Sequence, residues 1–384
     1  MKFLKRFNEE LDPSTYRSAA DKILAGEGSD YYKSGKKKNN SREDRATALN
    51  KFANTRENRT LLYYAFDWDD NILRMPTEIM VQTEDGNEIG MSTADFAIYR
   101  DKIGKKEHFE YINKNKQKHI IVGLDYSVAF RNFKDDVDSG IFRKDVERAI
   151  ALGDEGKAPA WEKFIKCLTN GAFFAIITAR GHEPESIRKG IEYIIDNVLD
   201  DDQKQEMYNN LMKFDHLFKI SNVDDLPKFL EGVASENLLV KKYLDLCQPH
   251  LVGVSATSRA SRGGSAASPE EAKVKALTDF ISDVNMHVSE LNAITRATSK
   301  DKTPYIAKVG FSDDDPGNIK HMTRELTSKD LEKEELWKDW EFIRKVVIIN
   351  TNNPEDVIET PLTSRTEPFS ERKLIKSYKD YGKN

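Results

Sequence analysis

Residues 63–77 (YYAFDWDDNILRMPT) contain three carboxylates directly behind an apolar run. The run, residues 61–66, is aliphatic and aromatic, and it is followed by Asp67, Asp69 and Asp70. A short apolar run stopped by polar turn residues is typical of a buried strand in a parallel sheet, and ligands bind at the carboxyl ends of such strands. Carboxylates crowded at that end repel one another unless a cation or a phosphate reaction uses them. Taken alone, the same residues also fit a solvated acidic turn.

Two further apolar runs end in polar residues that suit the same site. Residues 172–177 (AFFAII) lead to Thr178, and residues 305–311 lead to three consecutive acids, Asp313, Asp314 and Asp315. In a doubly wound parallel sheet the carboxyl ends of neighbouring strands meet at one edge. We therefore expect these polar side chains to lie close to Asp67.

The remaining patterns alternate between strands and helices. Helices are expected at residues 92–103, 160–168, from Pro184, from Ser268 and at 320–344, and strands at residues 119–124, 251–254 and 346–350. Residues 77–91 alternate around Asp85-Gly86, which predicts a hairpin. The alternation predicts an α/β fold, a Rossmann-like doubly wound parallel sheet with an inserted cap and an N-terminal extension.

The domain organisation follows from shifts in pattern and charge. We expect a core at residues 60–74 and 156–350, an inserted cap at 75–155, and a polar tail at 351–384 that lies over the surface. Residues 1–59 hold fourteen Lys and Arg against nine Asp and Glu, whereas the rest of the chain is acidic. Such asymmetry indicates a basic, partly flexible N-terminal arm that could contact nucleic acid.

Composition excludes several classes of protein. The 384 residues are 38% hydrophobic and 33% charged with a net charge of −5, which is typical of a soluble protein and argues against a nucleic-acid-binding surface over the whole chain. The two cysteines, Cys167 and Cys247, lack the spacing of metal ligands and indicate a reducing compartment, so a cytoplasmic location is expected. No apolar run approaches the roughly 18 residues of a membrane span, and no membrane partner is expected.

Four sequence patterns follow one another along residues 60–350. They are an apolar strand followed by D-x-D (AFDWDDNIL), an apolar strand ending in Thr (FFAIITARG), a Lys at a helix start (SPEEAKVKALTDF), and an apolar strand ending in paired acids (VGFSDDDPGNI). This order resembles the haloacid-dehalogenase-like (HAD) hydrolase superfamily, in its phosphatase-type members. No Gly-rich phosphate loop of the G-x-x-x-x-G-K-(S/T) type is present, which argues against a P-loop kinase.

The resemblance implies a role for each matching residue. Asp67 would be the nucleophile that forms a phosphoaspartyl intermediate. Asp69 would protonate the leaving oxygen and then activate water. Thr178 would bind a phosphate oxygen, and Lys273 would neutralise the substrate and the intermediate.

The resemblance also implies a Mg²⁺ site. Asp67, the backbone carbonyl of Asp69 and Asp313 would hold the ion, and Asp314 is the second candidate at the last position. Hard oxygen ligands of this kind are those that Mg²⁺ prefers.

Several positions depart from the superfamily pattern or leave alternatives open. Asn71 stands where these proteins often have Thr or Val. Asp315 leaves the fourth pattern ambiguous by one residue, and Asp70 could be a turn residue only. The rivals of Lys273 are Lys275, Lys300, Lys302 and Lys308. Arg180 and His182 follow the second pattern and could either line the site or form a surface entry to the next helix.

These patterns predict a Mg²⁺-dependent phosphomonoester hydrolase. The substrate expected is a phosphorylated small molecule such as a nucleotide, or a phosphorylated nucleic-acid end, because of the basic arm and a loop with Arg259 and Arg262. The sequence does not distinguish hydrolysis from transfer of the phosphoryl group to an acceptor other than water.

The alternative is a non-catalytic binding or virion-associated protein that keeps the fold. Residues 1–11 (MKFLKRFNEEL) resemble the short leaders that direct internal proteins into tailed-phage capsids. That resemblance implies a phage-encoded protein with a capsid contact through the arm.

Overall fold

A computed structural model describes residues 60–99, 102–103, 108–113, 115–135, 140–213, 238–254, 268–298, 303–327, 340–352 and 358–361. The predicted basic arm at residues 1–59, the loop with Arg259 and Arg262, the alternatives Lys300 and Lys302, and the tail beyond residue 361 lie outside these residues.

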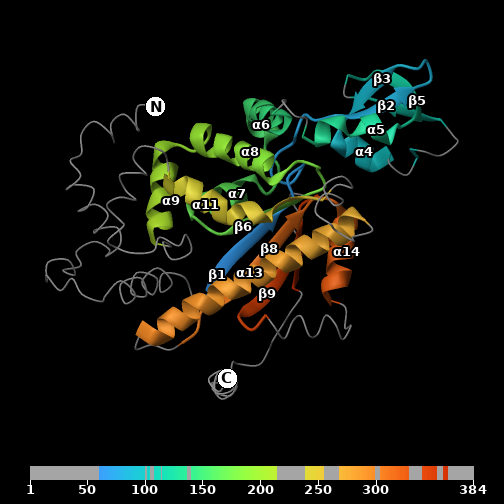
Figure 1. Cartoon of the computed structure of the whole chain (residues 1–384). Coiled ribbons are helices and arrows are strands. Elements are labelled where there is room, and N and C mark those ends of the chain that lie inside the picture. Colours follow the sequence, from blue (N-terminus) through green and yellow to red (C-terminus); the bar gives the residue numbers. More distant parts are fainter. Residues whose placement is uncertain are drawn as a thin grey trace.

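The main sheet has six strands in the order β10-β9-β8-β1-β6-β7. They are β1 (Thr60–Phe66), β6 (Phe174–Thr178), β7 (Leu251–Gly253), β8 (Ile306–Asp313), β9 (Ile343–Asn350) and β10 (Ile358–Pro361). Figure 1 labels four of them, β1, β6, β8 and β9. The first five strands pair in parallel, and β1 lies between β6 and β8. The predicted α/β fold with a parallel sheet is confirmed at this level.

The C-terminal part of the sheet differs from two predictions. The predicted helix over residues 320–344 was wrong at its end, because Ile343 and Arg344 already belong to β9, while the helix α14 spans Pro316–Thr327. The predicted surface tail was also wrong near its start. Strand β10 pairs antiparallel with β9, Ile358 opposite Asn350. Residues 358–361 contain no apolar run that would indicate a strand, and this edge strand is held by its main-chain pairing with β9.

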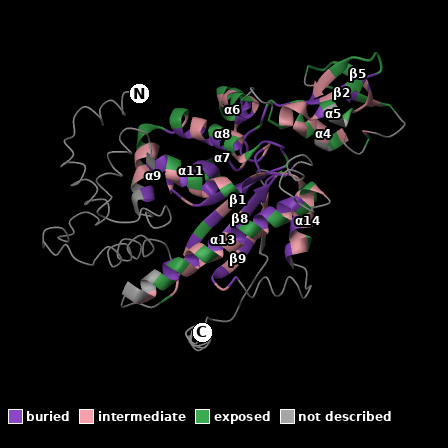
Figure 2. Cartoon of the chain, in the orientation of Figure 1, coloured by how far each residue is buried: buried purple, intermediate pink, exposed green. Residues whose placement is uncertain are grey.

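Helices cover both faces of the sheet. Successive side chains of an extended segment point to opposite faces. At the start of β6, Phe174 contacts Phe164 of α7 (Trp161–Thr169) and Tyr243 of α11 (Leu238–Cys247), whereas Phe173 contacts Phe280 of α13 (Pro269–Thr298). The strands between these layers are buried (Figure 2). The sheet is therefore the centre of a layered core.

The helix α8 (Pro184–Asn197) completes the layer that contains α7 and α9 (Asp201–Lys213). Its buried isoleucines recur every three to four residues, which is the spacing of one helical face, and Pro184 stands at its first turn. The helix α6 (Ile141–Ala151) packs on α8 through Phe142, which lies so close to Gly190 that an added Cβ would be 2.6 Å from its ring.

A separate antiparallel sheet has the order β3-β2-β5-β4. Its strands are β2 (Ile79–Thr83), β3 (Glu88–Met91), β4 (Phe109–Ile112) and β5 (Lys118–Gly123), and the short helices α4 (Thr93–Tyr99) and α5 (Tyr126–Ala129) accompany it. The β2–β3 turn contains Gly86 with φ +79°, as the Asp85-Gly86 hairpin signal predicts. A small core of Val81, Met91, Tyr111 and Ile121 holds it together.

The segment 75–155 contains two structurally different parts. Residues of the antiparallel sheet share their own core, whereas α6 at the end of the segment buries Phe142, Val146 and Ala149 in the core of the main sheet. The predicted cap range therefore includes a helix that packs with the main domain. Its buried residues are spaced by three and four, which presents one apolar face to α8.

The carboxyl ends of β1, β8 and β9 are joined through the buried side chain of Asn71. Its Nδ2 lies 3.0 Å from the Asp67 carbonyl oxygen and 2.9 Å from Ser312 Oγ, and its Oδ1 accepts a hydrogen bond of 2.6 Å from Thr351 Oγ1. Asn has both donors and an acceptor at one position, which a Val at this position could not supply. Asn71, which stands where proteins of the superfamily that the sequence resembles often have Thr or Val, thus links the ends of β1, β8 and β9.

We expect Asn71→Ala to lower the free energy of unfolding by about 3 kcal/mol, because it leaves several buried polar groups without partners. Denaturant unfolding followed by circular dichroism measures this change. The control is Asn197→Ala, an exposed residue whose amide bonds only within its own helix, and its effect should stay within about 0.5 kcal/mol. Equal losses in the two variants would contradict the structural role of Asn71.

Candidate functional site

Three of the predicted site residues follow adjacent strands of the main sheet. Asp67 comes directly after β1, Thr178 is the last residue of β6, and Asp313 is the last residue of β8. Because β1 pairs with both neighbours in parallel, Phe66 lies opposite Ile176 on one side and Ser312 on the other. The chain reverses direction across the sheet at β1, and this is where α/β sheets form a crevice.

Lys273 joins two of these strand ends. It lies in the first turns of α13, and its Nζ is 3.1 Å from Asp67 Oδ1 and 2.7 Å from Asp313 Oδ2. The three side chains are at most 8% exposed. Burial acts to lower the pKa of Lys273 because it disfavours the positive charge. The nearby carboxylates of Asp313 and Asp67 have the larger combined effect, so the pKa of Lys273 is raised. Its rivals Lys275 and Lys308 are exposed.

Helix α14 fixes the orientation of Asp313 and separates the roles of the three consecutive acids. Asp313 Oδ2 accepts hydrogen bonds from Lys273 and, at 3.1 Å, from Asn318 Nδ2. Asp315 turns instead to the start of α14, where its Oδ1 accepts a hydrogen bond of 2.7 Å from the Gly317 N–H. Asp315 is therefore a helix-capping residue, and Asp313 and Asp314 face the site.

Asp67, Asp313 and Asp314 form a compact carboxylate cluster. One oxygen from each lies within 4.8 Å of the others. Burial, with the charges of Asp313 and Asp69 adding to it and Lys273 opposing, raises the pKa of Asp67 to about 8. Burial, together with the charges of Asp67, Asp313 and Asp70, raises the pKa of Asp314 to about 9. A divalent cation would relieve this repulsion, and the all-oxygen donor set fits Mg²⁺.

Asp69 is turned toward Arg180 and not toward the carboxylate cluster. Arg180 Nε donates to Asp69 Oδ2 at 2.7 Å and Arg180 Nη2 donates to Asp69 Oδ1 at 2.6 Å, which is a bidentate pair. Thr178 Oγ1 is 3.5 Å from Asp69 Oδ2, so the predicted phosphate-binding hydroxyl lies at the edge of hydrogen-bonding distance to it. Thr178 itself is fully buried.

The antiparallel sheet region contacts the site at two places. Thr93 at the start of α4 donates a hydrogen bond of 2.7 Å to Asp70 Oδ2, and Asp70 has a φ of +53°. The segment that returns to the main domain pairs with the loop after β6, where the Gly181 N–H donates to the Phe133 carbonyl at 2.6 Å. Asp70 is thus both a turn residue and the contact of the inserted region.

Sequence reasoning left undecided, or did not name, four residues that the structure places at the site. Arg180 is 1% exposed and belongs to the site and not to the surface. The sequence indicated that Arg180 could lie at the site, because it stands two residues after Thr178 at a strand end. Asn318 had a signal in its spacing, because Asp313-Asp314 and Asn318 form a DD-x-x-x-N pattern. Thr77 and Thr351 carry no such signal, because each reaches the site from a different element and only the folded contacts bring it there.

His182 is buried beside these residues without taking part in their network. Neither of its ring nitrogens has a hydrogen-bond partner among the described residues, and its ring lies 5.1 Å from that of Phe142. Burial, and then the charge of Arg180, lower the pKa of His182 from 6.5 to about 3. The imidazole is neutral at neutral pH and belongs to the wall of the site.

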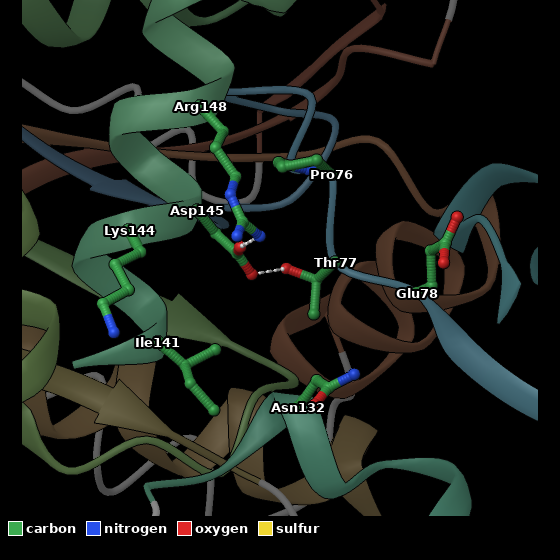
Figure 3. Close-up of a pocket in the computed structure, with 8 residues that line it drawn as sticks. All are labelled: Pro76, Thr77, Glu78, Asn132, Ile141, Lys144, Asp145 and Arg148. Atoms are coloured by element: carbon green, nitrogen blue, oxygen red, sulfur yellow. Dashed lines mark hydrogen bonds and ion pairs between the residues drawn. The ribbon is translucent and has the colours of Figure 1, made fainter. Parts of the chain in front are cut away.

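A cavity of about 310 Å³ lies between α6 and the segment that enters β2 (Figure 3). Its lining includes Thr77, Asn132, Lys144, Asp145 and Arg148. The ion pair of Arg148 and Asp145 and the hydrogen bond of Thr77 to Asp145 lie on its wall. The cavity therefore adjoins the Thr77 side of the site.

In the described part of the chain, none of the helices has the length and apolar character needed to cross a membrane.

Comparisons with protein-family models, with curated proteins and with solved structures gave no match.

We expect Mg²⁺ to stabilise the folded protein, because it binds the clustered carboxylates only when folding brings them together. At about 10 mM Mg²⁺ and a dissociation constant of about 1 mM, the free energy of unfolding should rise by about 1.4 kcal/mol. Thermal unfolding with and without Mg²⁺ measures the effect. Asp313→Asn should lose most of the shift, whereas Asp154→Asn at an exposed site should keep it. The same shift in both variants would place the ion elsewhere.

We expect His182 to make the folded protein less stable in mild acid. Its folded pKa of about 3 lies below the ordinary 6.5, so as the pH falls below 6.5 the unfolded chain binds a proton that the folded chain does not. Stability should fall by up to about 1.4 kcal/mol per pH unit from this group. Denaturant unfolding between neutral pH and about pH 5 measures how the free energy of unfolding changes with pH. This change should be less steep for His182→Gln than for the wild type. His108→Gln, at an exposed position, should keep the wild-type slope.

Proposed function

We propose that this chain is a Mg²⁺-dependent phosphomonoester hydrolase of the HAD type that acts through Asp67. The observation that carries the proposal is the buried bridge of Lys273 to Asp67 and Asp313, at 3.1 Å and 2.7 Å. A buried cation between carboxylates of two strand ends is costly as a purely structural device. It is what a site for a transferring phosphoryl group needs, since such a site works by positioning and charge neutralisation.

Asp67 is the group we assign to the attack on phosphorus. Its backbone N–H continues the β1–β8 ladder by a hydrogen bond of 2.8 Å to the Ser312 carbonyl, and Asn71 holds its carbonyl. The carboxylate is therefore fixed at the strand end. Lys273 beside Oδ1 favours the ionised form that a nucleophile requires. The attack forms the Asp67–phosphorus bond and breaks the bond to the leaving oxygen.

Asp69 is the group we assign to proton transfer. Its carboxyl gives a proton to the leaving oxygen in the first step, and its carboxylate takes a proton from water in the second. That water attacks phosphorus, phosphate leaves and Asp67 is regenerated. Thr178, next to Asp69, suits an oxygen of the phosphoryl group.

The metal ion would be held by the side chains of Asp67, Asp313 and Asp314, with the Asp69 carbonyl as a further oxygen ligand. When bound, Mg²⁺ supplies neutralisation of the phosphoryl charge. Asp67 then has two cationic neighbours, Lys273 and the ion, which together outweigh the repulsion from Asp313 and Asp314. Without the ion, burial and the neighbouring carboxylates raise the pKa values of Asp67 and Asp314 although Lys273 opposes them, so a second cation would favour the ionised forms.

For the substrate we propose a nucleotide or a phosphorylated nucleic-acid end. The support is the sequence of the basic arm and the Arg259 and Arg262 loop, both outside the described residues. A contact of the arm with nucleic acid or a capsid, and a cytoplasmic or virion-associated location, belong to the same proposal. Assays with nucleotides and with 3′- and 5′-phosphorylated oligonucleotides separate these substrates.

We expect phosphate release from an aryl phosphate and from one of these nucleotide substrates to require Mg²⁺. Asp67→Asn should lower kcat by about 10³-fold or more, because the amide is no nucleophile. Asp154→Asn, at an exposed position, serves as the matched control and should retain activity. Turnover that survives Asp67→Asn would contradict this assignment. No wild-type turnover, with the Mg²⁺-dependent stabilisation retained, would favour the non-catalytic binding protein.

A further inference from the structure

A buried polar chain runs from Asp69 to helix α6. Arg180 Nη2 donates both to Asp69 Oδ1 at 2.6 Å and to Thr77 Oγ1 at 2.7 Å. Thr77 Oγ1 in turn donates to Asp145 Oδ2 at 2.5 Å, the hydrogen bond drawn in Figure 3. The four residues come from the β1 loop, the β6 loop, the segment before β2, and α6.

Arg180 is held by two aromatic rings and by the hydrogen bonds of its Nε and Nη2, whereas its Nη1 has no hydrogen-bond partner among the described residues. Its guanidinium carbon lies 4.7 Å from the ring centre of Phe133 and 5.5 Å from that of Phe142, and its side chain is 1% exposed. Its backbone is closely packed against β7, because an added Cβ at Gly253 would lie 2.6 Å from the Arg180 carbonyl oxygen. A planar guanidinium with this support presents two hydrogen bonds in one fixed direction.

This arrangement constrains the carboxylate of Asp69 more than that of Asp67. Both of its carboxylate oxygens are hydrogen-bonded to the same guanidinium, whereas Asp67 touches its cation through Oδ1 only. A carboxyl group otherwise rotates easily about its terminal bonds. The bidentate pair fixes that rotation.

We propose that Arg180, itself held by Thr77 and Asp145, is the positioning residue of Asp69. This inference rests on the proposed function, in which Asp69 moves the protons. Arg180 directs the carboxyl toward the leaving oxygen in the first step, when the proton passes from Asp69 to that oxygen. It then stabilises the carboxylate left behind, which takes a proton from the attacking water in the second step.

Thr77 is the informative position for a test, because it touches Arg180 but not Asp69. Thr77→Val removes the hydroxyl at nearly constant volume, and Thr77→Ser keeps the hydroxyl. The matched control is Thr169→Val, a buried threonine at the end of α7 whose hydroxyl meets only the Lys166 carbonyl. Arg180→Lys keeps the charge and loses the bidentate geometry.

The experiment measures kcat and KM for p-nitrophenyl phosphate, phenyl phosphate and an alkyl phosphate, which are in order of increasingly poor leaving groups. Proton delivery matters most for the poorest leaving group. Thr77→Val should lower kcat about tenfold for the alkyl phosphate but by less than about threefold for p-nitrophenyl phosphate, with KM within about twofold. Arg180→Lys should show the same dependence on the leaving group, and its kcat for the alkyl phosphate should fall about 100-fold. Thr77→Ser and Thr169→Val should resemble the wild type.

Four results would overturn the inference. A loss of the same size on all three substrates, or a loss confined to KM, would make Arg180 a structural residue only. Thr77→Ser behaving like Thr77→Val would show that the hydroxyl is not what matters. Wild-type protein without Mg²⁺-dependent turnover would overturn the proposed function, and this inference with it. An active wild type with a uniform loss in the variants would overturn this inference alone.

Discussion

The buried contact of Lys273 with Asp67 and Asp313 is the interaction on which the arrangement of the site depends. A lysine that is 1% exposed would be expensive to bury without its carboxylates, and the carboxylates would repel one another without it. The three groups come from a helix and two strands that are far apart in the sequence, so the contact requires the parallel sheet to be formed. When Asp314 is counted, three carboxyl groups face one ammonium group, and a divalent cation would offset the charge of the ionised carboxylates.

The sheet order supplies the geometry for this contact. Strand β1 lies between β6 and β8, so its carboxyl end is flanked by the ends of both neighbours. Asn71 then ties β1, β8 and β9 together just behind Asp67, with Thr351 as its third partner. Strand ends would otherwise be the first part of a sheet to fray. The hydrogen bonds of one amide thus hold the carboxylates in register.

The inserted antiparallel sheet is joined to the same loops by polar contacts. Thr93 bonds to Asp70, and Thr77 bonds to Arg180, which holds Asp69. The acid assigned to proton transfer therefore depends on the inserted region, whereas Asp67 depends on the sheet and α13. The two carboxylates are two residues apart in sequence and are oriented by different parts of the fold. Such separation suits two groups that must act on opposite sides of one phosphoryl group.

The sequence by itself determined the α/β class, the strand ends that carry Asp67, Thr178 and Asp313, and the hairpin at Asp85-Gly86, because local periodicity and turn chemistry encode these features. It favoured Lys273 but left four rival lysines, it missed β10, and it misplaced the end of the helix predicted over residues 320–344. It also gave no sign that Asp69 would turn to Arg180. Only tertiary structure decided these points, since they depend on which distant elements are brought together and on which polar groups then lack water. Burial selects the partner, and burial is a property of the whole fold.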